Sequence, residues 1–492
     1  DSPSTPTSKL PRSLPQAAAS MSSTTSIQLE SQSIPTTNIS SNTSRLRGPA
    51  NPGTASAPLD PILEASRQAD SQVPDGGYGW VVAGCCFVLS FWIVGISYSW
   101  GVMQAVLIAR GLASPSTLSF AGSLAPALIS VTAVVNAQFF RKVGARWVAG
   151  MGVVLLGLGQ VLAGFAIDNV AGLFVTNGVT VGLGMGLCFS TLSIMPPQYF
   201  SRRRGLANGI VFSGGGFGGA ALSIVSDKLI RRLGPAWTYR AIGLGILATG
   251  LPAAVLIRER VEVKNARRST AAGAARGMVE WGLFRNPAFA FLFAASAIGT
   301  FPLLVPPFFI PLYAQQGLGL PSATGAALLA GFNLTSAVGR ILCGLLCDRL
   351  GAVNTLLGSF VMGAVSMLVL WPASTSLAPL AVFVVVNGVA NGAFFSTMPT
   401  VAGNIFGSAR VGVAMGMLVT GWGGGYLMVS HVLFLACGAP IAGHLLDAYG
   451  GSENGLQAYR PAMFYAGSLT LVSGTFVALM RYRLTKAWLA KI

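Results

Sequence analysis

From Trp80 onward, apolar residues run in stretches of roughly 20, separated by short segments that contain Gly, Pro and basic residues. A helix of that length crosses the hydrocarbon layer of a membrane and satisfies its own peptide hydrogen bonds there. The pattern therefore predicts an all-α membrane protein with about twelve transmembrane helices. We expect them near residues 80–104, 118–140, 148–167, 172–195, 205–230 and 237–257, and again near 286–312, 322–346, 353–371, 376–399, 411–447 and 461–481.

The apolar segments form two sets of six that repeat each other in sequence. Asn177-Gly178-Val179 corresponds to Asn387-Gly388-Val389, and the segment from Gly205 to Gly209 corresponds to Gly412 to Gly416. Several matches at nearly one offset indicate a duplicated, pseudo-symmetric transporter fold. We predict a disordered cytoplasmic tail (1–74), an N-terminal six-helix half (75–257), a cytoplasmic central loop (258–285), a C-terminal six-helix half (286–482) and a cytoplasmic C-terminus (483–492).

Composition supports a bilayer as the solvent for most of the chain. Of 492 residues, 52% are hydrophobic and only 9% are charged, and the mean hydropathy is +0.65. The first 74 residues differ, because they are rich in Ser, Thr, Pro, Ala and Gln and poor in aromatic residues. Such a segment buries too little apolar area to offset the entropy of ordering the chain, so we expect disorder.

The net charge of +17 arises from 31 Lys and Arg against 14 Asp and Glu. The basic residues lie mainly in short segments between apolar runs, which indicates membrane loops and argues against nucleic acid as a partner. Because basic loops stay in the cytoplasm, their distribution places both termini there, with roughly nineteen basic residues inside and about six outside. The plasma membrane is the expected location.

Two motifs precede predicted helices and carry a family resemblance. Asp75-Gly76-Gly77-Tyr78-Gly79-Trp80 stands before the first helix, and Tyr199-Phe200-Ser201-Arg202-Arg203-Arg204-Gly205-Leu206-Ala207-Asn208-Gly209 leads into the fifth. Both resemble signatures of the monocarboxylate porter family within the major facilitator superfamily, and the resemblance covers about residues 75–482. It implies a secondary transporter that works by alternating access. The candidate gating residues are Asp75, Gly76, Gly77, Tyr78, Trp80, Arg202, Arg203 and Arg204.

A third motif, from Gly344 through Asp348 and Arg349 to Gly351, follows the eighth predicted helix. It resembles the superfamily loop Gly-x-x-x-Asp-Arg-x-Gly, whose acid is expected to meet a helix N-terminus or a neighbouring Arg in one conformational state only. The matching loop after the second helix has Arg141 where the acid would stand. We therefore expect this gating latch only in the second half.

Arg340 is the sharpest candidate for substrate binding. It lies about two turns before the cytoplasmic end of the eighth helix, where a charge is costly unless it faces a cavity or a partner. In the family an Arg at this place is associated with holding the substrate carboxylate, which a guanidinium can pair with in bidentate fashion. Snorkelling or structural pairing is the alternative. Further candidate contacts are Ser336, Asn333, Tyr313, Asn387 and Asn391, each of which could instead join helices.

A proton is only a candidate co-substrate. Ser336 occupies a position that is acidic in animal relatives, and the lysine position of those relatives falls near Val102. Asp227 and Asp447 are expected at outer helix ends. His431 lies in the segment 428–437, which interrupts the family pattern; a gene-model error or a re-entrant bulge is the alternative to a proton relay there.

Two features of the apolar segments suggest helix contacts and kinks. The glycine run 214–219 lacks the Lys-Ser/Thr ending of a phosphate-binding loop, so we expect it to pack at a moving interface that faces Gly421 to Gly425. In the seventh helix, four prolines are expected to free backbone carbonyls and to kink the helix: Pro302, Pro306, Pro307 and Pro311.

The resulting hypothesis is a secondary transporter of a small organic anion, monocarboxylate-like and of fungal type. An efflux transporter for a secondary metabolite and a non-transporting membrane nutrient sensor are the alternatives. An enzyme is not expected, because the chain offers no Ser/His/Asp set and has only two histidines. We expect no cofactor and no metal, and we read the six cysteines, all in apolar runs, as buried residues. The sequence gives no indication of the oligomeric state.

Overall fold

The computed structural model describes residues 73–113, 115–260, 280–303, 305–427 and 456–486. The chain divides into two units, Asp1–Pro58 and Leu59–Ile492, and every described residue belongs to the second. Within the described ranges the regular structure is helical throughout. Most of the predicted tail, most of the central loop, and the segment 428–437 with His431 lie outside these ranges.

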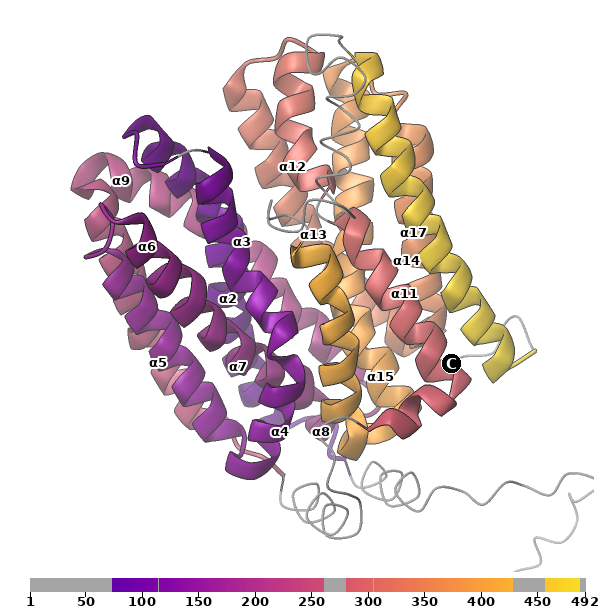
Figure 1. The fold of residues 1–492 in the computed structure, drawn as a ribbon. Coiled ribbons are helices and arrows are strands. Elements are labelled where there is room, and N and C mark those ends of the chain that lie inside the picture. The colour runs from indigo at the N-terminus through magenta and orange to yellow at the C-terminus, as the bar shows by residue number, and fades with distance from the viewer. Residues whose placement is uncertain (1–72, 114, 261–279, 304, 428–455, 487–492) are drawn as a thin grey trace, which may run out of the picture. The chain divides into compact units, whose positions relative to one another are not determined.

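The first six predicted crossings form what we call the N-terminal half (Figure 1). Two breaks lie inside predicted crossings: α3 and α4 meet at Thr132 at an angle of 62°, and a π-helical stretch joins α6 to α7. The elements are α2 (Tyr78–Ala109), α3 (Pro115–Val131), α4 (Ala133–Val143), α5 (Ala145–Ala163), α6 (Val170–Leu173), η1 (Phe174–Thr180), α7 (Val181–Ile194), α8 (Pro196–Tyr199) and α9 (Arg204–Leu256).

The C-terminal half follows the central loop and begins with a short 3₁₀ helix. The prolines of the seventh helix lie in α11 and α12, on either side of residue 304, which the structure does not describe, and the two helices belong to one candidate span, Pro287–Gln315. The elements are η2 (Trp281–Arg285), α11 (Pro287–Leu303), α12 (Val305–Leu312), η3 (Tyr313–Gly317), α13 (Ser322–Leu350), α14 (Ala352–Val365), η4 (Ser366–Leu370), α15 (Leu377–Leu427) and α17 (Leu456–Leu484).

The described ranges contain nine helices long and apolar enough to cross a membrane, or ten if the bent pair is one crossing. Two of the helices are too long for a single crossing. The 53 residues of α9 would span about 80 Å, and the helix is broken at Gly234, where φ is 79°. The 51 residues of α15 are broken in the same way at Gly407, where φ is 78°. With the bent pair as one crossing, adding the second arm of α9 and of α15 to the ten gives the predicted twelve.

The two halves share turn geometry where their sequences differ. Gly144 ends α4 with φ 97°, and its N–H group donates to the carbonyl of Phe140. Gly351 ends α13 with φ 98°, and its N–H group donates to the carbonyl of Cys347. Glycine is needed at both positions because other residues rarely adopt this backbone conformation. The loop geometry is thus kept although Arg141 replaces the acid in the first half.

Apolar contact between the halves is concentrated at one end of the helices. We call this the basic end. It carries Asp75, Arg202, Arg204, Arg258 and Asp348, and hydrogen bonds connect these residues through the segment 199–205. One continuous core contains residues of both halves. Toward the opposite end, which we call the far end, the buried residues separate into a cluster within each half.

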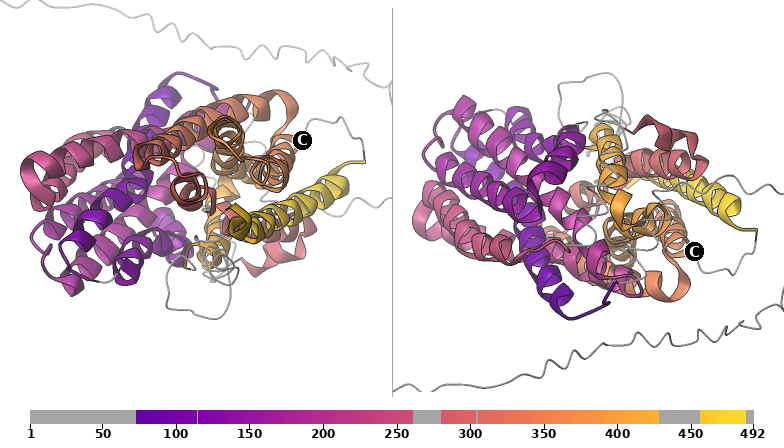
Figure 2. Two further views of the ribbon diagram at one scale, coloured as in Figure 1. Left: turned by 90° about the horizontal axis from the view of Figure 1, so that it is seen from above. Right: turned by 90° about the horizontal axis from the view of Figure 1, so that it is seen from below.

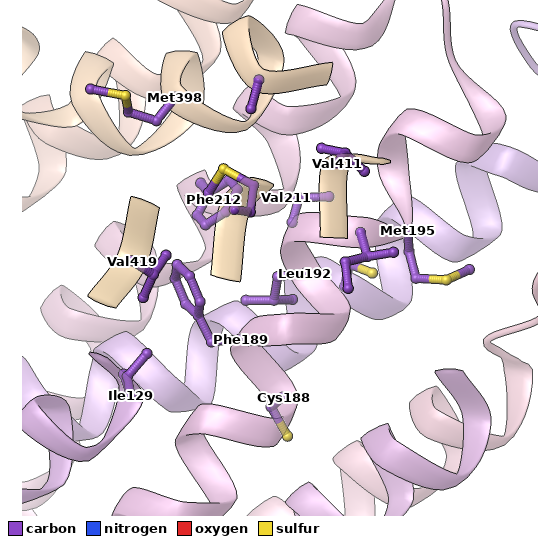
Figure 3. Close-up of a cluster of buried hydrophobic side chains, with 14 of the residues drawn as sticks. Ile129, Cys188, Phe189, Leu192, Met195, Val211, Phe212, Met398, Val411 and Val419 are labelled. Carbon is purple, nitrogen blue, oxygen red and sulfur yellow. The ribbon is translucent and has the colours of Figure 1, made fainter. Parts of the chain in front are cut away.

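The shared core is built from helices that lie far apart in the sequence. Figure 2 views the helices from both ends and shows the two halves as neighbouring groups. In Figure 3, Phe189 and Ile129 of the N-terminal half lie beside Val419 of α15, and these three side chains line one small cavity. The ring of Phe189 also packs against Trp422 at a centroid distance of 5.8 Å. The second arm of α15 therefore packs against the N-terminal half.

Candidate functional site

A close approach between the halves joins α9 to α13 through glycines. Gly205 and Gly344 face each other so closely that a Cβ on either would collide with the carbonyl oxygen of the other. A Cβ added to Gly209 would lie 2.5 Å from the carbonyl oxygen of Arg340, and one added to Gly216 would lie 2.7 Å from Cβ of Ala337. Small residues allow such backbone contact between helices in a membrane. Any movement of the two halves must break or slide this seam.

The prediction that the glycine run faces Gly421 to Gly425 is wrong at the described positions. Added Cβ atoms on Gly214 and Gly218 would meet the carbonyls of Phe87 and Phe91 on α2, within the same half, and one on Gly421 would meet α11. The reason is helical periodicity, because residues four apart share a face. Gly214 and Gly218 occupy the face toward α2, whereas Gly205, Gly209 and Gly216 occupy the face toward α13.

Asp348 of α13 caps the first turn of α9 across the two halves. Its Oδ1 accepts a hydrogen bond from the N–H group of Gly205 at 2.7 Å, and its Oδ2 accepts one from Leu206 at 2.8 Å. The first N–H groups of a helix lack intrahelical partners and lie at the positive end of its dipole, so a carboxylate is favoured there. The acid of the loop motif thus meets a helix N-terminus, as its resemblance implied.

Asp75 binds the same region from within the N-terminal half. Its Oδ1 accepts hydrogen bonds from the N–H groups of Ser201 at 2.7 Å and Arg202 at 2.8 Å, with Arg203 N–H at 3.3 Å. Asp75 itself has φ 50°, a conformation that Asp tolerates better than most residues. The two signature motifs, 126 residues apart, are therefore joined directly. Sequence reasoning treated them separately and missed this contact.

The rest of the first signature packs on the same segment. A Cβ on Gly79 would lie 2.9 Å from Cβ of Tyr199, and the rings of Trp80 and Phe200 are 4.7 Å apart. Gly76 and Gly77 form the turn before α2, and Gly77 has φ 58°. The hydroxyl of Tyr78 donates to the carbonyl of Leu256 at 2.6 Å. The motif therefore fixes α2 to both ends of α9.

The three consecutive arginines occupy different environments. Arg204 is buried; its Nε donates to the carbonyl of Phe200 at 3.0 Å and its Nη1 to Oδ1 of Asn404 on α15 at 3.1 Å. Arg202 and Arg203 are exposed, as is Arg349 at the end of α13. Of these four candidate gating residues, only Arg204 has a side-chain contact with the other half among the contacts found in the described ranges.

A second polar contact between the halves was missed from the sequence. Nδ2 of Asn208 on α9 donates to Oγ1 of Thr400 on α15 at 2.8 Å, and both residues are buried. Asn208 and Arg204 both lie within the second signature. Nothing in the sequence indicated that their partners would be Thr400 and Asn404 on α15. Their positions follow from the crossing of α9 and α15, which a single sequence does not reveal.

Arg340 lies deeper in the bundle between the halves. Its side chain is 1% exposed, its Nη1 donates to the carbonyl of Phe212 on α9 at 2.7 Å, and its Cζ is 4.9 Å from the ring centroid of Phe395 on α15. Arg340 precedes Asp348 by about 12 Å along α13. The guanidinium is therefore held against helices of both halves, one layer inside the basic end.

The structure brings three of the six predicted substrate contacts together. Asn333, Ser336 and Arg340 are all buried on α13, spaced so that they share one helix face. A Cβ on Gly216 would lie 2.9 Å from the carbonyl oxygen of Asn333. The hydroxyl of Ser336 lies 3.0 Å from the position a Cβ on Gly392 would take. These residues line the seam toward α9 and α15.

The other three join helices within the C-terminal half. The hydroxyl of Tyr313 donates to the carbonyl of Ser374 at 2.7 Å, within the far-end cluster. Nδ2 of Asn391 donates to the carbonyl of Leu303 at 2.7 Å, and Nδ2 of Asn387 to Oγ of Ser366 at 2.8 Å. These contacts match the alternative that the sequence left open, hydrogen bonding between helices.

The sequence profile of the major facilitator superfamily matches residues 80–430 and 322–488. The chain belongs to the major facilitator superfamily. It is therefore a multi-pass membrane protein of a transporter superfamily, and the prediction that it is not an enzyme agrees with its relatives, which are transporters.

Among curated superfamily relatives, an MFS-type transporter of Gibberella moniliformis is 26% identical over 440 residues, which is 87% of this chain and 98% of that protein. The agnestins efflux protein AgnL12 of Paecilomyces divaricatus is 26% identical over 82% of this chain and 88% of its own. Monocarboxylate transporter 3 of Rattus norvegicus is 28% identical over 83% of this chain and 81% of its own.

Solved structures of the superfamily confirm the fold. The proton:xylose symporter XylE matches with a TM-score of 0.64 at 13% identity, over 82% of this chain and 95% of its own. The human organic anion transporter MFSD10 matches with a TM-score of 0.59 at 14% identity, over 82% and 100%. The all-α membrane fold expected from the apolar pattern, and the major facilitator fold that the motif resemblance implied, are thus confirmed.

Proposed function

We propose that this chain is a secondary active transporter of the monocarboxylate porter branch, which carries a small organic anion by alternating access. Support comes from the superfamily, from relatives that include monocarboxylate transporters, and from the direct contact between the two signature motifs. The two halves, about residues 75–257 and 286–482, would move against each other around a site on the α9–α13 seam.

The observation that carries this proposal is the position of Arg340. Three arginines are buried in the described ranges, and two of them, Arg204 and Arg481, lie at the basic end beside polar side chains. Arg340 lies further in, against helices of both halves. A charge at such depth is costly in a membrane protein, so its presence there favours a role in holding an ion of opposite charge. A guanidinium suits a carboxylate because it can donate two parallel hydrogen bonds.

The contacts at the basic end would form the gate on that side. Asp348, Arg204 and Asn208 each bond across the halves, which supports reading this conformation as one closed at the basic end. Opening would require the carboxylate of Asp348 to leave the first turn of α9. The carboxylate and the N–H groups would then bind water in place of each other. By the distribution of basic loops, this end and both termini would be cytoplasmic, in the plasma membrane.

The second candidate is export of a carboxylated secondary metabolite. It is favoured by the curated fungal relatives, which include the agnestins efflux protein. The same buried arginine would serve either direction, because alternating access is reversible and the driving gradients set the net flux. Import and export therefore differ in substrate and coupling, and not in the placement of Arg340.

The test is uptake by proteoliposomes of a panel of radiolabelled small carboxylates, measured in both membrane orientations. Wild-type protein is expected to accumulate at least one of them. Arg340→Lys and Arg340→Ala are expected to lower uptake roughly 10- to 100-fold, since hydrogen bonds to charged groups contribute about 1.5–3 kcal/mol. The matched control is Arg232→Ala, which removes an exposed arginine. Binding without accumulation would favour the sensor, and full activity of both Arg340 variants would exclude the assigned role.

A further inference from the structure

A small cavity lies inside the C-terminal half, among α11, α14, α15 and α17. Its volume is about 30 Å³, and its lining includes Leu303, Ser359, Met367, Asn387, Asn391 and Thr470. An organic anion does not fit such a volume. One or two water molecules do, since each needs roughly 10–15 Å³ of centre-accessible space.

The hydroxyl groups that line this cavity have already donated their hydrogens. Oγ of Ser359 donates to the carbonyl of Leu356 at 2.7 Å, and Oγ1 of Thr470 donates to the carbonyl of Ala466 at 2.8 Å. Each oxygen retains lone pairs, because a hydroxyl has one donor and two acceptor positions. The lining is therefore rich in acceptors, and a ligand must bring hydrogens to it.

Among the lining residues, Asn387 has a buried side-chain oxygen that lacks a hydrogen-bond donor in the described part of the chain. The side chain is 1% exposed, and its Nδ2 donates to Oγ of Ser366, whose own hydrogen goes to the carbonyl of Gly363 at 2.7 Å. The hydroxyl of Ser366 is thus committed, which fixes the orientation of the amide. Oδ1 of Asn387 finds no hydrogen-bond donor within the described ranges. A buried acceptor in this situation is costly unless something donates to it.

The N-terminal half meets the equivalent demand with its own side chain. Asn177 corresponds to Asn387 in the repeat, and its Oδ1 accepts a hydrogen bond from Nε2 of Gln160 at 2.8 Å. Gln160 follows the turn glycine Gly144 by sixteen positions, and Met367 follows Gly351 by the same sixteen. Methionine cannot donate a hydrogen bond. One half thus has an amide donor where the other has a thioether beside a cavity.

We propose that this cavity is a buried water site, in which water donates to Oδ1 of Asn387 and takes the place of the amide of Gln160. The water would lie near the carbonyl of Leu303 at the end of α11, to which Nδ2 of Asn391 donates at 2.7 Å. That carbonyl has lost its helical donor because Pro307, four residues on, has no N–H group. Water and Asn391 together would satisfy the polar groups around this carbonyl.

Radiolytic footprinting of the purified full chain tests this directly, because X-ray pulses convert bound water into hydroxyl radicals that oxidise adjacent side chains. Met367 lines the cavity, and Met185, also buried, is the matched reference in the N-terminal half. Met367 is expected to be oxidised well above Met185, and Asn387→Leu is expected to bring it down to that level. Asn177→Leu is the matched substitution and should leave Met367 unchanged. Equal oxidation of the two methionines in the wild type would overturn the proposal.

A side-chain exchange between the halves gives a second readout that survives if Asn387→Leu fails to fold. Met367→Gln should supply the missing donor and raise the temperature of thermal unfolding, whereas Gln160→Met should lower it. The unfolding temperature should be the same in NaCl, KCl and choline chloride, because the ligand is neutral. A shift specific to Na⁺ that Met367→Gln abolishes would identify a cation in place of water and overturn the proposal, as would a destabilising effect of Met367→Gln.

Discussion

The carboxylate of Asp75 accepts a hydrogen bond from the N–H group of Ser201 at 2.7 Å, and this contact joins the segment before α2 to the segment before α9. Four residues later, the N–H group of Gly205 donates to Asp348 of the other half. Two carboxylates, one from each half, thus bind consecutive parts of the same chain segment. The start of α9 is therefore fixed within its own half while it is bound across the halves.

Removal of the charge from Asp348 is expected to loosen the basic end. Asp348→Asn would weaken two hydrogen bonds to the first turn of α9, and a loss of about 1–2 kcal/mol corresponds to roughly 5- to 30-fold in the equilibrium. Cys347 is a native reporter, because it is 3% exposed and packs against Gly205. Its alkylation rate, measured by mass spectrometry with buried Cys188 as the internal reference, should rise. Asp227→Asn, which removes an exposed acid paired with Arg231, should leave that rate unchanged.

Substitution of Asp75 is expected to have a smaller effect in the same direction. Asp75 has a positive φ, so Asp75→Gly and Asp75→Asn keep the backbone unstrained while they remove the charge. A lost helix-cap type contact costs about 1 kcal/mol, or roughly fivefold in the Cys347 alkylation rate. The alkylation rate of Cys347 should rise more in Asp75→Gly than in Asp75→Asn, because the side-chain amide oxygen of Asn can still accept hydrogen bonds. An alkylation rate unchanged in both variants would mean that Asp75 does not influence the closed end.

A methyl group on the α9–α13 seam is expected to abolish transport. Gly205→Ala and Gly344→Ala would each place Cβ against a backbone carbonyl of the opposite helix, which cannot yield as a flexible side chain does. The basic end should then fail to close, so uptake should fall and Cys347 should react faster. Gly150→Ala is the matched control, since a Cβ there meets nothing within 4 Å. Normal uptake by the two seam variants would show that the halves need not approach this closely.

A substitution of Tyr313 can distinguish a structural role of this residue from a role in substrate binding. Tyr313→Phe deletes a buried hydrogen bond to the carbonyl of Ser374 and is expected to cost about 1–3 kcal/mol of stability, because that carbonyl loses its donor. The KM for the transported anion should stay the same, since the ring remains in its cluster with Trp371 and Tyr459. Thermal unfolding and concentration-dependent uptake measure the two quantities. A raised KM without loss of stability would return Tyr313 to the binding site.

Local motifs predicted a kind of contact where a residue type has few favourable partners. An acid in a helix-end loop favours a helix N-terminus or a neighbouring Arg, and Asp348 binds a helix N-terminus. The prolines of the seventh helix predicted a kink, and Pro302 and Pro311 lie inside the helices of that span. Neither motif named the partner helix, because that depends on how α9, α13 and α15 cross, and glycine contacts depend on helix rotation that one sequence does not specify. For the same reason, the sequence could not show that Asn387 and Asn391 join helices within one half whereas Asn333 and Ser336 lie on the seam between the halves.

We propose that Arg340 selects an anion between the halves. The most direct measurement compares transport efficiency, kcat/KM, for a carboxylate taken up in the panel and for its uncharged primary amide, in wild-type protein and in Arg340→Gln. The wild type is expected to prefer the carboxylate by roughly 10- to 100-fold, because the guanidinium forms a charge-assisted pair with it, and Arg340→Gln is expected to lose this preference. An equal preference in both proteins would contradict it.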